Sequence, residues 1–240
     1  MISVNNISKT YKGFLLSKKR DVSNVLEDIF FEINKNDVIG LVGHNGSGKT
    51  TLLKILFNLI KEDTGKISLN DMDGDYEKFI KEKASLINKN ERSFFWRLTV
   101  KENINFFNSL LECPCSNEDI QEKIDFLEVD KLMHKRFGSL SSGEKTKVLI
   151  LRGLLKNPKL VLVDEIMSSL DIESKKMIIN YIKKINVKGV TIIWVTHSLD
   201  EIDALCNRFI IMKNGRIHMQ KNTKDISSKP SEFIYQALSK

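Results

Sequence analysis

Apolar and polar positions follow patterns along the chain that predict strands. Residues 28–33 (DIFFEI) alternate between the two, as a half-buried strand does. Residues 38–42, 160–163 and 190–195 are short and mainly apolar, which is typical of strands buried on both faces of a parallel sheet. Residues 209–217 predict a β-hairpin with an Asn-Gly turn. Together these runs indicate an α/β fold.

Two capping-box spacings mark the starts of helices between these strands. In the pairs Thr99/Glu102 and Ser141/Glu144, a hydroxyl residue precedes a glutamate by three positions. Apolar residues recur at helical spacing within residues 116–137 as well. The middle of the chain is therefore predicted to be largely helical.

Composition narrows the class of protein. The chain has 240 residues, 41% hydrophobic and 29% charged, as in an ordinary globular protein. No apolar run approaches the roughly 18 residues needed to cross a bilayer, and the first residues lack the features of a signal peptide, so we expect a cytoplasmic location. Cys113, Cys115 and Cys206 fit no zinc spacing.

The net charge of +7 comes from 38 basic and 31 acidic residues. Basic residues are scattered, apart from Lys18-Lys19-Arg20 in an expected loop. We interpret this charge as a solvated surface, and we expect no specific nucleic-acid partner.

A glycine-rich loop follows the strand at residues 38–42 and matches the pattern G-x-x-x-x-G-K-[ST]. Backbone N–H groups of such a loop surround phosphate oxygens, and the N-terminus of the next helix adds partial positive charge. Lys49 should reach the β- and γ-phosphates, and the Thr50 hydroxyl should bind Mg²⁺. The predicted nucleotide-binding residues here are Gly43, His44, Asn45, Gly46, Ser47, Gly48, Lys49, Thr50 and Thr51.

The other two buried strands also end in reactive side chains. Asp164 and Glu165 follow residues 160–163, where Asp164 can hold Mg²⁺ and Glu165 can activate the attacking water. His197 follows the third strand and is predicted to sense the γ-phosphate. The sequence therefore predicts a nucleoside triphosphatase.

The segment Leu140-Ser-Ser-Gly-Glu-Lys145 resembles the LSGGQ signature of ABC ATPases. Residues 168–171 (SSLD) resemble the D-loop of that family, and His197 matches its switch histidine. Tyr11 matches the aromatic residue on which adenine stacks. These elements occur in the family's order and cover residues 2 to about 220.

This resemblance implies a P-loop NTPase of the ABC cassette type. Its α/β fold has a RecA-like mixed sheet core, an N-terminal antiparallel β-subdomain and an inserted α-helical signature subdomain. We expect one domain over residues 1–240, with the core at about 1–89 and 158–222. The helical subdomain then spans about 90–157, and a short tail spans 223–240.

The resemblance also implies ATP and Mg²⁺ as ligands, and a head-to-tail dimer with a second copy or a paired homologue. Each ATP would lie between one subunit's phosphate loop and the other's signature. Integral membrane permease subunits are the implied partners, so the chain would lie on the inner face of the membrane. The residues implied to act across the dimer are Ser141, Ser142, Gly143, Glu144 and Asp171.

Three segments depart from the family's usual pattern. The signature has Ser142 in place of glycine and Glu144 in place of glutamine, and the carboxylate could weaken the approach of a γ-phosphate. Residues 166–167 (Ile-Met) replace the usual Pro-Thr, which leaves the rigidity of the D-loop in question. The expected Q-loop glutamine is replaced by Asn90 or its neighbour Glu91, either of which would be the residue near Mg²⁺.

Residues 90–99 (NERSFFWRLT) hold three consecutive aromatic residues and resemble a form of this region found in ABC-2-type exporters. Phe94 and Phe95 are expected to pack inside the helical subdomain, while Trp96 and Arg97 face a partner. A purely buried cluster is the alternative. We therefore favour an exporter ATPase. An importer ATPase shares the same catalytic residues, and a soluble ABC ATPase acting on nucleic acid or ribosomes is a third possibility.

Overall fold

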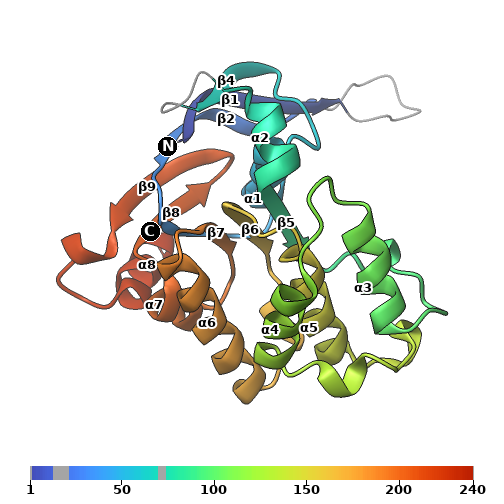
Figure 1. The fold of residues 1–240 in the computed structure, drawn as a ribbon. Helices are drawn as coiled ribbons and strands as arrows, with labels where there is room; N and C mark the ends of the chain where they lie inside the picture. The colour runs from blue at the N-terminus through green and yellow to red at the C-terminus, as the bar shows by residue number, and fades with distance from the viewer. Residues whose placement is uncertain (1, 13–21, 70–73, 240) are drawn as a thin grey trace, which may run out of the picture.

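The computed structural model describes residues 2–12, 22–69 and 74–239. The basic cluster at residues 18–20 lies outside these ranges. No helix in the described part of the chain is long and apolar enough to cross a membrane. The elements form two sheets with helices between and around them (Figure 1).

A three-stranded antiparallel sheet contains the N-terminus. Strands β1 (Ile2–Lys12), β2 (Val22–Ile33) and β4 (Thr64–Leu69) pair in the order β2-β1-β4. The alternation predicted for residues 28–33 is confirmed, because Ile29, Phe31 and Ile33 are buried while Phe30 is exposed. The predicted N-terminal antiparallel subdomain is therefore present.

The second sheet has six strands in the order β5-β6-β7-β3-β8-β9. The first five run parallel, and β9 pairs antiparallel with β8 through the predicted Asn214-Gly215 turn. The strands are β3 (Val38–Gly43), β5 (Ala84–Asn88), β6 (Leu160–Asp164), β7 (Thr191–Val195), β8 (Arg208–Lys213) and β9 (Arg216–Asn222).

Each parallel strand divides its side chains between two cores. In β7, Ile193 and Val195 pack with the antiparallel sheet and with α1 (Lys49–Leu56), whereas Ile192 and Trp194 pack on the opposite face. Helix α1 thus lies between the two sheets. The remaining core helices are α2 (Tyr76–Lys83), α6 (Ile172–Val187), α7 (Leu199–Leu205) and α8 (Pro230–Leu238).

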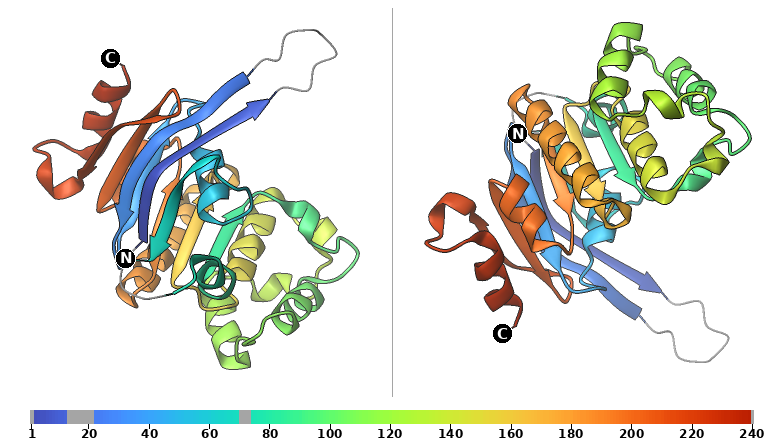
Figure 2. Two further views of the ribbon diagram at one scale, coloured as in Figure 1. Left: turned by 90° about the horizontal axis from the view of Figure 1, so that it is seen from above. Right: turned by 90° about the horizontal axis from the view of Figure 1, so that it is seen from below.

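Three helices form a subdomain beside the β5 edge, at the opposite end of the molecule from α8 (Figure 2). They are α3 (Val100–Ser109), α4 (Asn117–Phe126) and α5 (Ser142–Gly153). Both predicted capping boxes are confirmed, at Thr99 for α3 and at Ser141 for α5. Short 3₁₀ turns complete the chain at Glu91–Ser93 (η1), Asp130–Leu132 (η2), Phe137–Ser139 (η3), Met167–Ser169 (η4) and Thr223–Asp225 (η5).

The aromatic segment divides differently from our expectation. Phe94 is buried and stacks on Phe137, with ring centroids 4.2 Å apart, as predicted for a core residue. The expectation for Phe95 is wrong, because its side chain is 46% exposed. The buried Asn103 amide binds both the N–H and the C=O of Phe95, which fixes the backbone so that the ring points outward. Trp96 is 50% exposed, so the segment is not a purely buried cluster.

Candidate functional site

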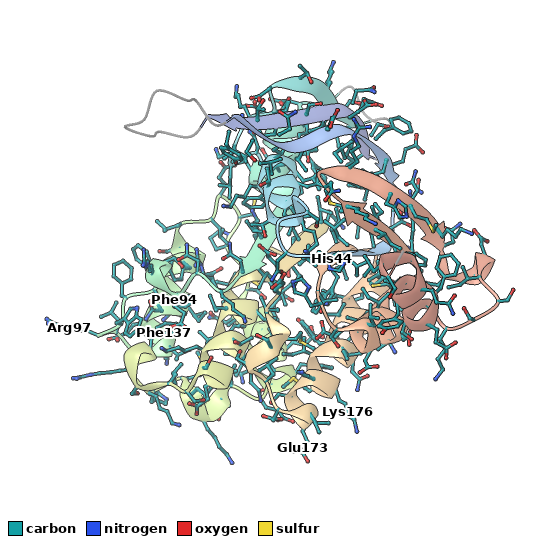
Figure 3. The ribbon with its side chains drawn as sticks, turned by 180° about the vertical axis from the view of Figure 1, so that it is seen from behind. His44, Phe94, Arg97, Phe137, Glu173 and Lys176 are labelled. Carbon is teal, nitrogen blue, oxygen red and sulfur yellow. The ribbon has the colours of Figure 1, made fainter. Side chains whose placement is uncertain are left out.

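The glycine-rich loop joins β3 to α1 and has the form that its sequence predicts. Gly48 is the N-cap of α1 and has φ of 99°, in the left-handed region. A Cβ at this position would lie 2.7 Å from the Val25 carbonyl oxygen, so both the backbone angle and the available space require glycine. His44 marks the loop in Figure 3, near the middle of the molecule and away from Phe94, Arg97 and Phe137 of the helical subdomain.

Lys49, the first residue of α1, turns its ammonium back into the loop. The ammonium donates hydrogen bonds to the carbonyl oxygens of Gly43 and His44, at 2.8 and 3.1 Å. Burial lowers the pKa of Lys49, and the nearby Glu165 and Asp164 carboxylates oppose this shift. The arrangement places a partly desolvated cation within the glycine-rich loop at the N-terminus of α1, which suits a phosphate group.

The Ser47 hydroxyl provides an independent test of whether the loop fits an anion. Its oxygen is buried, and it is the one buried side-chain N or O atom in the described residues without a hydrogen-bond partner. An unpaired buried hydroxyl is unfavourable unless a ligand completes its hydrogen bonding. A phosphate oxygen in the loop could serve as that ligand.

Thr50 and Asp164 form a divalent-metal half-site at the carboxyl end of β6. The Thr50 hydroxyl lies 3.5 Å from Asp164 Oδ1. Burial raises the pKa of Asp164, a shift that the Thr50 hydrogen bond opposes and the Glu165 charge reinforces. No three His, Cys, Asp or Glu side chains of the described chain gather to bind a metal by themselves. The donor set therefore fits Mg²⁺, which commonly takes one or two protein oxygens and completes its shell with phosphates and water.

Glu165 and His197 lie together at the ends of β6 and β7. His197 Nε2 is 2.7 Å from Glu165 Oε1, and both side chains are partly exposed. Glu165 has φ of 51°, which is strained for a residue with a side chain, and its N–H donates to the Val195 carbonyl. A carboxylate held in this way beside the loop can accept a proton from water.

The signature residues open α5 in a separate group. The Ser141 hydroxyl accepts a hydrogen bond from the Glu144 N–H, and the Glu144 carboxylate accepts one from the Ser141 N–H. Glu144 also pairs with Lys135 at 3.0 Å, and its pKa is lowered by these contacts. The glutamate that replaces the family's glutamine is thus engaged by its own helix start and by a cation. Ser142, which is exposed, and Gly143, which is partly exposed, are the first two residues of α5.

The D-loop segment is anchored firmly despite its unusual sequence. Ile166 and Met167 are almost fully buried, so apolar packing takes the place of the expected Pro-Thr pair. Asp171 caps α6 by accepting from the Ser174 N–H. The Ser169 and Thr146 hydroxyls lie 2.9 Å apart, which ties this segment to α5.

The region expected to replace the Q-loop begins at the carboxyl end of β5. Asn88 pairs with Asp164 in the sheet register, and Asn90 is exposed at the start of η1. Glu91 pairs with Lys145 of α5 at 2.9 Å, which leaves the Asn90 amide as the freer of the two candidates.

Two predicted contact residues, Tyr11 and Arg97, do not belong to the parallel sheet that carries the catalytic side chains. Tyr11 is 43% exposed near the end of β1, with the Lys9 ammonium 6.0 Å from its ring centroid. Arg97 points away from the helical subdomain (Figure 3). Lys145 and Lys89 were not predicted to contribute to the site, yet their ammonium groups bind Glu91 and Ser168. Lysine is common on surfaces, and these contacts join distant segments, so no local signal could have revealed them.

The structure therefore brings Lys49, Thr50, Asp164, Glu165 and His197 to one edge of a parallel sheet, the arrangement of a P-loop nucleoside triphosphatase. Residues 26–168 match the family described as ABC transporter, which is more than half of the chain. The chain belongs to this ABC transporter ATP-binding family, and it is an ATP hydrolase that uses Mg²⁺.

Relatives extend over almost the whole chain. It is 32% identical over 238 residues to an ABC transporter ATP-binding protein of Methanocaldococcus jannaschii, covering 98% of this chain and 82% of that protein. It is 34% identical to the molybdate/tungstate import ATP-binding protein WtpC of Pyrococcus horikoshii, over 99% of this chain and 67% of that protein. It is 28% identical to the ABC transporter ATP-binding protein NatA of Bacillus subtilis, over 90% of this chain and 87% of that protein.

Solved structures support the fold class. A dimeric bacterial ABC transporter cassette superimposes with a TM-score of 0.78 at 26% identity, covering 92% of this chain and 98% of that one. The ATP-binding subunit of an ABC transporter gives a TM-score of 0.81 at 24% identity, covering all of both chains. The predicted ABC cassette fold is thus confirmed.

Asp164→Asn should stabilise the free protein while impairing Mg²⁺-dependent activity. An acid whose folded-state pKa is raised destabilises the fold at pH values above both pKa values, and this penalty disappears below the unfolded pKa. The variant should therefore have a higher free energy of unfolding at about pH 7, and the gain should shrink at about pH 4. Urea unfolding of the two proteins at each pH, without Mg²⁺ or nucleotide, measures this difference in stability.

Asp63→Asn is the control, because it should lower the free energy of unfolding at neutral pH instead of raising it. Hydrogen bonds from Lys9 and Thr10 hold the pKa of Asp63 well below its usual range, so its charge stabilises the fold at neutral pH. That stability is lost only as the pH falls through the folded-state pKa. A loss of stability at neutral pH in Asp164→Asn would contradict our account of its desolvation.

Proposed function

We propose that the chain is the ATP-driven subunit of a membrane exporter and that it works on separate transmembrane subunits. The proposed ATP hydrolysis rests on the contact of His197 with Glu165 beside the partly buried Lys49 ammonium. A general base, a residue that orients it and a phosphate-binding cation are then within one site. ATP hydrolysis needs all three.

In this proposal the loop residues 43–51 surround the phosphates, and Tyr11 stacks on adenine. Lys49 exchanges its carbonyl partners for the β- and γ-phosphates, and Ser47 gains a phosphate acceptor. Thr50 and Asp164 would hold Mg²⁺, with the Asn90 amide as a further ligand, and a bound Mg²⁺ would supply positive charge to the phosphate oxygens. These roles are supported by the donor set of each side chain.

Glu165 is the proposed general base. It accepts a proton from the water that attacks the γ-phosphate, while His197 holds the carboxylate at 2.7 Å and contacts the γ-phosphate itself. The strained backbone at Glu165 is held by the hydrogen bond from its N–H to the Val195 carbonyl.

Replacing Glu165 by Gln should lower ATP turnover by about two to four orders of magnitude, the usual range for loss of a general base. Binding of a fluorescent ATP analogue should be retained, because Lys49 and the loop are unchanged. Steady-state ATPase and equilibrium titration measure the two effects. Turnover close to that of the unsubstituted chain would exclude Glu165 as the base, while Lys49→Ala is the control that should weaken binding itself.

We further infer that two chains, or this chain and a homologue, bind ATP head to tail. Ser141 and Gly143 at the N-terminus of α5 then complete the partner's site, since helix starts attract phosphate. Ser142, Glu144 and Asp171 line the same face. The capping box holds the Glu144 carboxylate at the helix start, and the Lys135 ammonium pairs with it there and offsets its charge, which supports the approach of a phosphate.

Mixing two inactive variants tests this arrangement. Lys49→Ala disables the phosphate loop, and Ser141→Arg blocks the signature at a cost of about 1 kcal/mol for the lost cap. Each variant alone should have little ATPase activity, whereas the mixture contains heterodimers with one intact composite site. Activity should therefore appear on mixing and depend on concentration. Full activity from a strictly monomeric chain would contradict the sandwich.

The permease contact is assigned to the groove between the core and the helical subdomain. A cavity of about 280 Å³ lies there, lined mainly by apolar residues together with Arg152 and Lys156. Exposed Trp96 and Arg97 lie on the same subdomain and have the composition of an interface anchor. A short segment of a membrane subunit is the proposed occupant, which makes the chain peripheral on the inner face of the membrane.

Export is favoured by the aromatic form of residues 90–99 and by the absence of the Q-loop glutamine. Import is the second candidate, because import ATPases are among the relatives: WtpC at 34% identity and the methionine import protein MetN 1 of Oceanobacillus iheyensis at 32%.

Reconstitution distinguishes the two directions. The chain is purified from native membranes with the subunits that remain bound to it, and the complex is placed in proteoliposomes with ATP outside. An exporter should concentrate compounds from a cell extract in the lumen, and Glu165→Gln complexes should not. Depletion of a preloaded lumen would instead indicate import.

A further inference from the structure

Lys145 connects three parts of the molecule through one ammonium group. It lies in the first turn of α5, directly after the signature residues, and its side chain is only 12% exposed. The ammonium pairs with Glu91 at 2.9 Å and lies 4.4 Å from the centroid of the Trp96 ring. A cation over an indole face and an ion pair are both favourable, and here they share the same charge.

Each of the three elements has a separate proposed role. Glu91 is the neighbour of Asn90, which is proposed to approach Mg²⁺. Lys145 belongs to the helix whose N-terminus serves the second ATP site. Trp96 is half exposed on the surface proposed for the membrane subunit. The same ammonium also lies 5.8 Å from the centroid of the Phe137 ring. A shift of residues 89–91 is therefore expected either to move α5 or to weaken a contact of Lys145.

Other contacts make this linkage stiff. Two turns further along α5, the Arg152 guanidinium binds the Ser93 hydroxyl and lies 4.2 Å from the Phe107 ring centroid. The backbone of Trp96 is fixed by the Gly138 N–H, which donates to its carbonyl at 3.0 Å. Because Ser93 and Trp96 are both held by these hydrogen bonds, we expect motion of this segment to be transmitted through the Lys145 side chain and the indole ring.

We infer that Lys145 is a positioning residue that couples nucleotide at the phosphate loop to the partner surface at Trp96. This inference rests on the proposed function, because it needs Asn90 to respond to Mg²⁺ and nucleotide. When residues 89–91 move toward the nucleotide, the ammonium follows the Glu91 carboxylate and leaves the indole. Coupling of this kind is reciprocal, so a partner that covers Trp96 also alters the position of the signature helix.

Tryptophan fluorescence of the full chain tests the coupling directly. The second tryptophan, Trp194, is 1% exposed and donates to Glu201, so it gives a constant background. In the Glu165→Gln background, ATP with Mg²⁺ should change the emission of Trp96. Trp96→Phe should abolish that change. Lys145→Arg should keep it because the cation remains, and Lys145→Met and Glu91→Gln should lose it.

A second ion pair of similar length, with more exposed side chains, provides the control. Lys81 and Glu112 also join the core to the helical subdomain, at 2.8 Å, but contact neither Glu91 nor α5. Lys81→Met should therefore leave the Trp96 response intact. Binding of a fluorescent ATP analogue is measured for every variant, and it should be unchanged in Lys145→Met, which does not touch the phosphate loop.

The outcomes separate the two levels of inference. Failure of the Glu165→Gln chain to bind the ATP analogue would contradict the proposed function. Normal binding without a Trp96 response, or an unchanged response in Lys145→Met and Glu91→Gln, would overturn the coupling role and leave Lys145 a structural residue. Because Glu91→Gln replaces a partly exposed side chain by one of the same size, it tests the coupling even if Lys145→Met lowers stability.

Discussion

The parallel register of β3, β6 and β7 is the constraint on which the nucleotide site depends. Val195 of β7 pairs with Leu41 of β3 on one side and with Asp164 of β6 on the other. Ladder hydrogen bonds fix the relative height of the strands, so the segments that leave their carboxyl ends begin side by side. Thr50 and Asp164 therefore meet although 114 positions separate them in the chain. The strand register of the sheet therefore sets the positions from which the loops of the site begin.

The sheet also sustains conformations that would be unfavourable alone. The Glu165 backbone has a left-handed φ, which costs about 1–3 kcal/mol for a residue with a side chain. Its N–H is bound to β7, and the following Ile166 and Met167 are buried, so the strained residue is held from both sides. Asp164 and Lys49 are partly desolvated close to each other, and each charge reduces the other's penalty. The packing of the two apolar cores thus holds reactive groups in conformations and environments that would be unfavourable for the isolated segments in water.

The features that the sequence predicts well are those determined by neighbouring residues. Gly48 is required by a local backbone angle, and the two capping boxes close within three positions, so each leaves a short motif. The orientation of Phe95 was not predictable in this way, because the side chain of Asn103 decides it from the next helix. The contacts of Lys145 join residues 54 positions apart and leave no periodic pattern. Tertiary contacts therefore determine two features that short motifs do not predict. These are which aromatic ring faces outward and which lysine joins two elements.

The position of β3 in the sheet has a consequence for folding during synthesis. This strand belongs to the first fifth of the chain, yet both of its neighbours, β7 and β8, come from residues 191–213. The strand that supports the phosphate loop stays without sheet partners until most of the polypeptide has been made, and non-local pairing of this kind is slow. Until then its apolar side chains and unpaired edges are open to wrong contacts. Nucleotide can stabilise the chain only after this late closure, so the nascent protein must reach its fold without help from its ligand.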